Sequence, residues 1–451
     1  MRLILGVAIV ISSFTSNVAW SQFTERDGAA TTQPGKAPAA RKRTPPPGLP
    51  AGFVPPRPVP EVTNIEKELL TAEEEKAFKP DLTKYQRALT SATLSEETRV
   101  LITRGIKFRL LRMTRKVHRP ILHLLRNDIL YKDLAFAKEL EVRTFFLEEL
   151  TKASADLLDN NFHVRLNVVL LLGNLKLTEE NEKRETQDVA FTPALEVLLK
   201  VFDDKTQLEA IKIPAVHGLQ RICQIGTPNR DQRLRVAEVF VSELNNIASN
   251  AWYQMRLAEG LGWVGIIHDR QPRPFVVQTL ATVLVDEKRD WQVRAQAARA
   301  LGRAPLDGSI NVSLISYAIV DLAAQGTTAC NQAPPGRTPY WIDFYLTLYL
   351  SFQPETGAER KAGHGLILRN KPASNPAYEQ ILTLVNHILD EEIADKDGKR
   401  SFSQEQVDAI VAWLENNPPN DPSVAPGEKP IMELVKGKPN VAKKDEKAAN
   451  P

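Results

Sequence analysis

The stretch DWQVRAQAARALGRAP, residues 290–305, has the features of one amphipathic helix with marked ends. Asp290 stands where an N-cap is expected, and Gly302 follows the last apolar residue of the pattern. Between them the apolar residues recur at three- and four-residue spacing, which places them on one helical face: Val293, Ala297, Ala298 and Leu301. The stretch therefore predicts a helix with one buried face.

The same arrangement recurs earlier in the chain. NNFHVRLNVVLLLG (160–173) and NAWYQMRLAEGLG (250–262) repeat the cap, the apolar offsets and the glycine. A looser copy at 211–219 lacks both the cap and the glycine. The first apolar positions, 164, 211, 253 and 293, lie 47, 42 and 40 residues apart. Another amphipathic segment precedes each of the last three copies, at 191–202, 230–244 and 274–285. The repeating unit is therefore a helix pair.

The period and the Val-Arg step identify a family resemblance. DWQVRAQAARALG resembles the second helix of a HEAT repeat, clearly over 161–303 and by continuity of pattern over 61–416. The resemblance implies an all-α, right-handed solenoid of stacked helix pairs. In such armadillo-like stacks the arginine of the step, here Arg165 or Arg294, pairs with a loop residue of a neighbouring copy. Asp290 and Gly302 would likewise be structural, and Gln254 departs from the pattern.

The two ends of the chain differ in composition from the helical part. Residues 1–21 combine Arg2, a short apolar run and small residues at Ala19 and Ser21, which predicts a secretory signal peptide and a periplasmic or extracellular location. Residues 22–60 form a proline-rich linker, and 417–451 are expected to be a disordered tail. Whether the signal is cleaved or retained stays open.

Composition and motifs exclude several classes of function. The formal charge of +3 does not require a nucleic-acid partner, and no later segment is long and apolar enough to span a membrane. Two cysteines, Cys223 and Cys330, allow one disulfide at most and no four-cysteine metal site. The histidines are scattered, and no nucleotide, zinc-protease or nucleophile-elbow motif is present. We therefore expect no cofactor, no metal and no catalytic centre.

A basic stretch at 99–127 contains nine Lys or Arg residues and no acid. Five of them are spaced to crowd one side of a helix: Arg104, Arg112, Arg115, Lys116 and Arg119. Such a stripe can hold an acidic polysaccharide by electrostatics. Alternatively it is a solvated face paired with acids elsewhere, such as Asp133, Glu139 and Glu141.

An aromatic segment, TPYWIDFYLTLYLSF (338–352), carries six aromatic side chains. Tyr340, Trp341 and Tyr345 are candidate anchors for a partner peptide or a sugar ring. The alternative is that they fill the core of their own helix pair.

These observations favour a non-catalytic extracytoplasmic scaffold that presents a solenoid surface to a protein or polymer partner. An exported enzyme with a site near the C-terminal region, built from Asp343, His364 and His387, is one alternative. An electrostatic binder of acidic polysaccharide is another. A cleft that gathers carboxylates or histidines would favour the enzyme, and a wall of arginines and aromatics would favour the scaffold.

Overall fold

The computed structural model describes residues 67–180, 186–353 and 365–433. Helices of all kinds hold 66% of these residues, as the sequence predicts for an all-α protein. The signal peptide, the proline-rich linker, His364 and residues 434–451 lie outside the described residues. All described residues belong to one compact unit.

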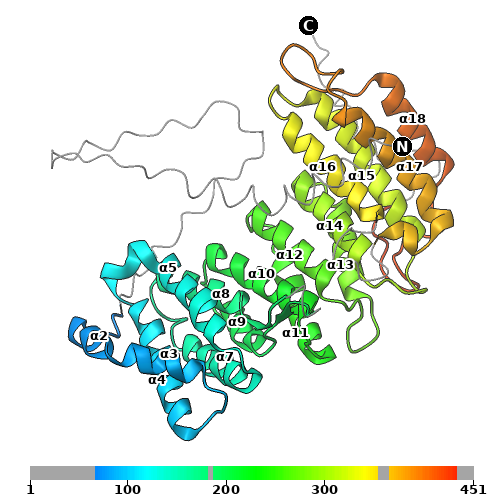
Figure 1. The fold of residues 1–451 in the computed structure, drawn as a ribbon. Coiled ribbons are helices and arrows are strands. Elements are labelled where there is room, and N and C mark those ends of the chain that lie inside the picture. The colour runs from blue at the N-terminus through cyan, green and yellow to red at the C-terminus, as the bar shows by residue number, and fades with distance from the viewer. Residues whose placement is uncertain (1–66, 181–185, 354–364, 434–451) are drawn as a thin grey trace. The chain divides into compact units, whose positions relative to one another are not determined.

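The described helices follow one another along the chain (Figure 1). The N-terminal part contains α2 (Ala72–Phe78), α3 (Asp81–Leu89), α4 (Glu96–Arg112), the 3-10 helix η1 (Lys116–Ile121), α5 (Leu122–Asn127), the π-helix η2 (Asp128–Asp133), α6 (Leu134–Phe136), α7 (Leu140–Ala155) and α8 (Phe162–Gly173). A two-stranded antiparallel hairpin, β1 (Lys176–Thr178) and β2 (Val189–Ala190), follows.

The remaining elements come in the predicted pairs. They are α9 (Ala194–Asp203), α10 (Glu209–Ile225), α11 (Arg230–Leu244), α12 (Ala251–Trp263), α13 (Phe275–Val285), α14 (Trp291–Arg303), α15 (Val312–Gln332), α16 (Thr338–Phe352), the short η4 (Leu366–Leu368), α17 (Lys371–Leu389) and α18 (Gln404–Asn416).

The helices begin where the sequence places their caps. The Asp290 side chain accepts a hydrogen bond from the backbone N–H of Gln292, so α14 starts at the next residue. Asn161 caps α8 and Asn250 caps α12 in the same way. Every apolar position of the predicted repeats is buried, from Val164 in α8 to Leu301 in α14. The cap and the spacing together therefore predict both the start of each helix and its buried face.

Helices pack in neighbouring pairs, and one helix of each pair packs on the next pair. We call α8, α10, α12, α14 and α16 the second helices. Each of them contacts the following one, and α9, α11 and α13 pack against their own second helices (Figure 1). The second helices thus form a continuous row of packed neighbours.

Glycines allow the second helices to approach closely. A Cβ placed on Gly218 of α10 would lie 2.7 Å from Cα of Gly173 in α8. A Cβ on Gly302 of α14 would overlap the backbone of Ser351 in α16, so the glycine that ends the predicted pattern is required by helix contact. Glycine is therefore required at these positions because the helices pack closely, and not because the chain turns there.

One polar contact per pair recurs at the position of the Val-Arg step, which is occupied by Arg165, Lys212, Gln254 and Arg294. Arg165 donates to the side chain of Gln207 at 2.9 Å, in the loop before α10. Lys212 Nζ lies 2.9 Å from Glu243 at the end of α11. Arg294 donates to Gln325 in α15 at 2.9 Å. At Gln254 the polarity reverses, because its Oε1 accepts from Arg289 at 2.6 Å. We call these four contacts the rungs.

The C-terminal segment differs from its prediction over residues 417–433, which we expected to belong to the disordered tail. Val424 and Ala425 are buried, and an isolated bridge joins Ser423 to Pro430. The Val424 carbonyl accepts from the backbone N–H of Asn311 at 2.8 Å. The prediction failed here because these few apolar residues are buried against distant helices, which local composition does not reveal.

Candidate functional site

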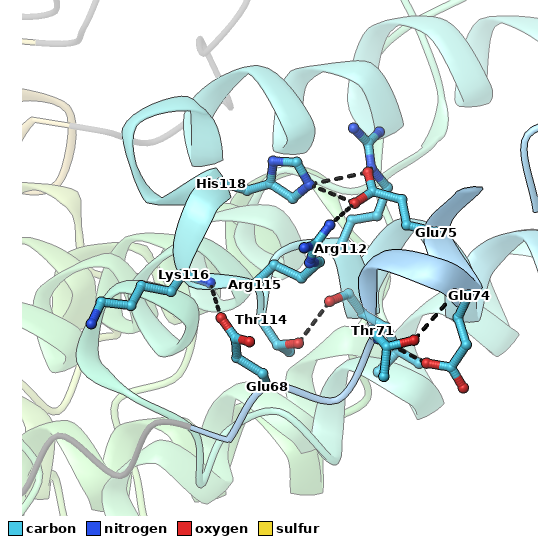
Figure 2. Close-up of polar contacts among 10 residues, drawn as sticks. Glu68, Thr71, Glu74, Glu75, Arg112, Thr114, Arg115, Lys116 and His118 are labelled. Carbon is cyan, nitrogen blue, oxygen red and sulfur yellow. Dashed lines mark hydrogen bonds and ion pairs between the residues drawn. The ribbon is translucent and has the colours of Figure 1, made fainter. Parts of the chain in front are cut away.

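Two members of the predicted basic stripe pair with one carboxylate, Glu75 of α2 (Figure 2). Arg112 Nε donates to Glu75 Oε1 at 2.8 Å, Arg115 pairs with Oε2, and His118 Nε2 lies 3.1 Å from both oxygens. Burial raises the pKa of Glu75, but hydrogen bonds from His118, Arg115 and Arg112 outweigh it and lower the pKa to about 2. The carboxylate is therefore ionised at neutral pH and holds α2 on the end of α4.

The other members of the stripe lie on different elements. Arg104 lies in the middle of α4, where it pairs with Asp81 at 3.1 Å and covers the ring of Phe78. The backbone N–H of Lys116 donates to Glu68 at 2.6 Å, and Arg119 lies half-buried in η1. Because α4 ends at Arg112, the five residues do not share one helical side.

The paired alternative for this stretch named Asp133, which does pair with a member of the stretch, whereas Arg104, Arg112 and Arg115 pair with other acids. The partners come from the preceding chain, at Glu75 and Asp81. Asp133, by contrast, is fully buried and pairs with Arg109 at 2.8 Å and with the hydroxyl of Tyr85 at 3.0 Å. Asp133 is thus paired with the basic stretch through Arg109, which is not among the five residues predicted to form the stripe.

The aromatic helix α16 packs inward. Tyr345 is fully buried, and its hydroxyl donates to the Ala323 carbonyl at 3.2 Å. Trp341 is 5% exposed and contacts Trp291 and Phe344 edge-on or tilted. Tyr340 is half-buried, with its hydroxyl 3.1 Å from the cap carboxylate of Asp290. In this conformation Trp341 and Tyr345 belong to the core, because α16 is covered by its neighbours.

The described residues of the predicted enzyme site, Asp343 and His387, each have their own neighbours. Asp343 lies on α16, where partial burial of the carboxyl raises its pKa and Arg299 opposes the shift. His387, near the end of α17, lies 2.9 Å through Nε2 from the Ser401 carbonyl. His364 lies outside the described residues. The structure gives Asp343 and His387 different partners.

A second charged surface lies on the second helices, and the sequence analysis missed it apart from Asp343. It consists of His217 and Arg221 on α10, Arg256 and Glu259 on α12, Arg299 and Arg303 on α14, and Asp343 on α16. We call these seven residues the charged row. No local pattern in the sequence marks these residues as a group, because they come together only once the helices are known to pack side by side.

One contact connects the charged row between α12 and α14. Arg256 Nη1 lies 2.6 Å from Glu259 Oε2, and Arg303 Nη1 lies 3.9 Å from the other oxygen. Burial raises the pKa of Glu259, but Arg256, Arg303 and Arg299 outweigh it, so the pKa is lowered. Burial and the nearby Arg256 lower the pKa of His217. Four guanidinium groups face two carboxylates, so the row is net positive.

An exposed tryptophan borders the charged row. Trp252 of α12 is 42% exposed, and the guanidinium of Arg256 lies 4.3 Å from its ring centroid. This is a cation–π contact, which holds the arginine against one face of the indole. The row therefore offers positive charge beside an aromatic surface.

Cys223 and Cys330 are free and buried, and burial raises each thiol pKa to about 11. Within the described ranges, no group of three His, Cys, Asp or Glu side chains is placed to hold a metal ion. None of the described helices is long and apolar enough to cross a membrane.

No protein-family description, characterised protein or solved structure matches the chain.

Proposed function

We propose that this protein is a non-catalytic extracytoplasmic scaffold, a right-handed solenoid of HEAT-like helix pairs that holds a protein partner along its second helices. The location is proposed from the pattern at 1–21. The repeat type is supported by the spacing of the copies and by rungs at every Val-Arg position from Arg165 to Arg294. Stacked pairs of this kind bury a continuous core and leave an extended surface on one side.

The charged row is the observation that carries the proposal. It runs over four successive second helices and contains four arginines, of which Arg256 lies against the exposed ring of Trp252. Arginine and tryptophan are the residues that most often dominate binding energy at protein interfaces. A wall of this composition favours a binding surface over a catalytic cleft.

An enzymatic role is the second candidate, because the charged row also gathers His217, Glu259 and Asp343. The pKa of Glu259 is lowered while that of Asp343 is raised, and such a division between carboxyls is a feature of acid–base sites. Electrostatic binding of acidic polysaccharide is the third. Arg104, Arg112 and Arg115 already pair with acids of the chain, which leaves less charge for that role in the N-terminal cluster.

Affinity capture from the extracytoplasmic fraction tests the scaffold. The bait is the tagged chain from residue 22 onward, compared with a row variant, Arg256→Gln with Arg299→Gln. A matched control, Arg235→Gln with Arg270→Gln, removes the same charge from exposed sites on α11 and in the loop before α13. The proposal expects a protein that is retained by wild type and control and lost from the row variant. Substrate turnover by the purified chain, with no retained protein, would contradict it.

A further inference from the structure

Residues 67–78, which we call the N-terminal strap, lie on the end of α4 and bury few side chains of their own. Most of the strap is α2, which has seven residues and one buried side chain, Phe78. Leu70 and Phe78 pack on Phe108 of α4 in a small cluster beside the main core. A helix this short is not stable in water by itself. The strap is therefore held by its contacts with the rest of the chain, and these can open before the main core unfolds.

The connection between α2 and α3 allows the strap to open as a unit. Lys79 ends α2 and Pro80 precedes the first residue of α3, so two residues separate the helices. Tyr85 and Leu89 of α3 lie in the main core. A few residues at the ends of helices are enough to absorb a hinge motion. The strap can therefore move away from α4 while α3 keeps its place.

The surface under the strap has a cationic part. Arg112, Arg115 and His118 all contact the carboxylate of Glu75, and their side chains are only 14% to 21% exposed (Figure 2). When the strap opens, these partly buried donors lose their acceptor, which is costly. The open surface therefore favours any segment that returns a carboxylate to the same place.

The surface also has an aromatic part. The rings of Phe78 and Phe108 are stacked, with their centroids 4.0 Å apart. Glu75 and Phe78 are three residues apart in α2, so both side chains lie on one side of the helix. A segment that replaces the strap must therefore present a carboxylate and an aromatic ring with the spacing Glu-x-x-Phe on a helix.

The strap of a second copy meets these requirements because it has the same sequence. Exchange of the strap between two copies keeps every contact and changes only which copy supplies it. The exchange is reciprocal, so it produces a closed dimer with twofold symmetry. Within one copy the short connection to α3 keeps the strap at an effective concentration in the millimolar range. The closed monomer therefore prevails in dilute solution, and the exchanged dimer forms when the protein is concentrated.

We infer that the surface under the N-terminal strap binds the strap of a second copy, so that two copies exchange residues 67–78. Arg112, Arg115 and His118 of each copy then receive Glu75 of the partner subunit. No residue of the charged row takes part, so this inference and the scaffold proposal can fail independently.

Two variants with complementary charge changes test the exchange on the chain from residue 22 onward. The strap variant is Glu75→Lys, and the site variant is Arg112→Glu with Arg115→Glu. Each variant places like charges together within its own copy, whereas exchange between the two variants places opposite charges together. Analytical ultracentrifugation should show a monomer for each variant alone and a one-to-one dimer for the mixture. We expect the mixed dimer to be at least about tenfold more stable than a dimer of either variant with itself.

Two controls separate exchange from general charge attraction. Glu75→Lys, Arg112→Glu and Arg115→Glu combined in one chain restore the pairing within a copy and should give a monomer. Glu73→Lys makes the same charge change at an exposed position of α2 and should not pair with the site variant. Circular dichroism checks that each variant is folded, and Arg115→Glu alone replaces the site variant if the double change unfolds the chain.

Three results would overturn the inference. The first is a mixture of folded strap and site variants that stays monomeric. The second is a dimer that forms equally well with Glu73→Lys, which would show attraction without exchange. The third is a wild-type chain that remains monomeric at about 1 mM, where exchange should compete with the closed form.

Discussion

The Arg289 guanidinium donates to Oε1 of Gln254 at 2.6 Å, whereas at the equivalent rung Arg165 donates to Gln207. Donor and acceptor have thus exchanged places while the contact is kept. The position itself requires one hydrogen-bonded pair across neighbouring segments, whichever side supplies the donor. The rung is therefore a property of the pair of sites and not of the Val-Arg sequence.

An exchange of the two side chains tests this rung. Gln254→Arg alone places two guanidinium groups together and should lower the free energy of unfolding by about 1–3 kcal/mol. Gln254→Arg combined with Arg289→Gln restores a donor–acceptor pair and should recover most of the loss. Chemical denaturation of the two single variants and the double variant measures the coupling. A double variant that shows the sum of the single effects would rule out the rung.

Close helix contact makes Gly218 sensitive to enlargement. Its Cβ in Gly218→Ala would lie 2.7 Å from Cα of Gly173, so α8 and α10 must separate. We expect a loss of about 1–3 kcal/mol in the free energy of unfolding. Gly308→Ala is the control, because a Cβ there meets nothing within 4 Å and should change stability by less than about 0.5 kcal/mol. Equal melting temperatures for the two variants would contradict the packing.

The Glu75 cluster predicts acid sensitivity at the N-terminal end. The pKa of Glu75 is lowered from 4.5 to about 2, so its ionised form stabilises the fold above pH 4.5 and this contribution is lost as the pH falls towards 2. Glu75→Gln should cost about 1–3 kcal/mol at pH 7. The difference in stability between this variant and wild type should therefore shrink as the pH falls from 4.5 to about 2. Thermal melts over that pH range measure the difference. Glu73→Gln is the control, because Glu73 is exposed.

Asp321 of α15 predicts the opposite pH dependence. Burial raises its pKa from 3.8 to about 6 against the effects of Arg294 and Gln325. The neutral form is therefore favoured in the fold, and its contribution is complete below pH 3.8 and lost as the pH rises through 6. Asp321→Asn should become more stable relative to wild type across that interval. A constant difference from pH 4 to pH 7 would show that Asp321 does not titrate there.

Local signals predicted the helices because each signal acts within a few residues. The caps at Asp290, Asn161 and Asn250 and the buried faces behind them follow from side-chain chemistry and helical spacing. The prediction that Arg165 pairs with a loop amide of the next copy was confirmed, with Gln207 as the partner. Arg294 instead reaches Gln325 inside α15, where the chain has a helix rather than a loop.

The sites depend on contacts between distant residues, and these were harder to predict. The charged row joins Arg221 to Asp343 through helices about 40 residues apart, and no local pattern marks it. The aromatic helix shows the converse problem, because spacing cannot tell a binding face from a core face. The hydroxyl of Tyr345 donates a hydrogen bond to the Ala323 carbonyl, so the whole side chain can lie in the core.

The bond between Asn311 and Val424 has a consequence for synthesis of the chain. Asn311 caps α15, and its Nδ2 also donates to the carbonyls of Asp421 and Ser423, more than 100 residues further on. Chains emerge from the ribosome N-terminus first, so the pairs up to α14 can fold while the rest is still being made. The start of α15 lacks its final partners until residue 424 has emerged. Completion of the fold therefore waits until synthesis has passed residue 424.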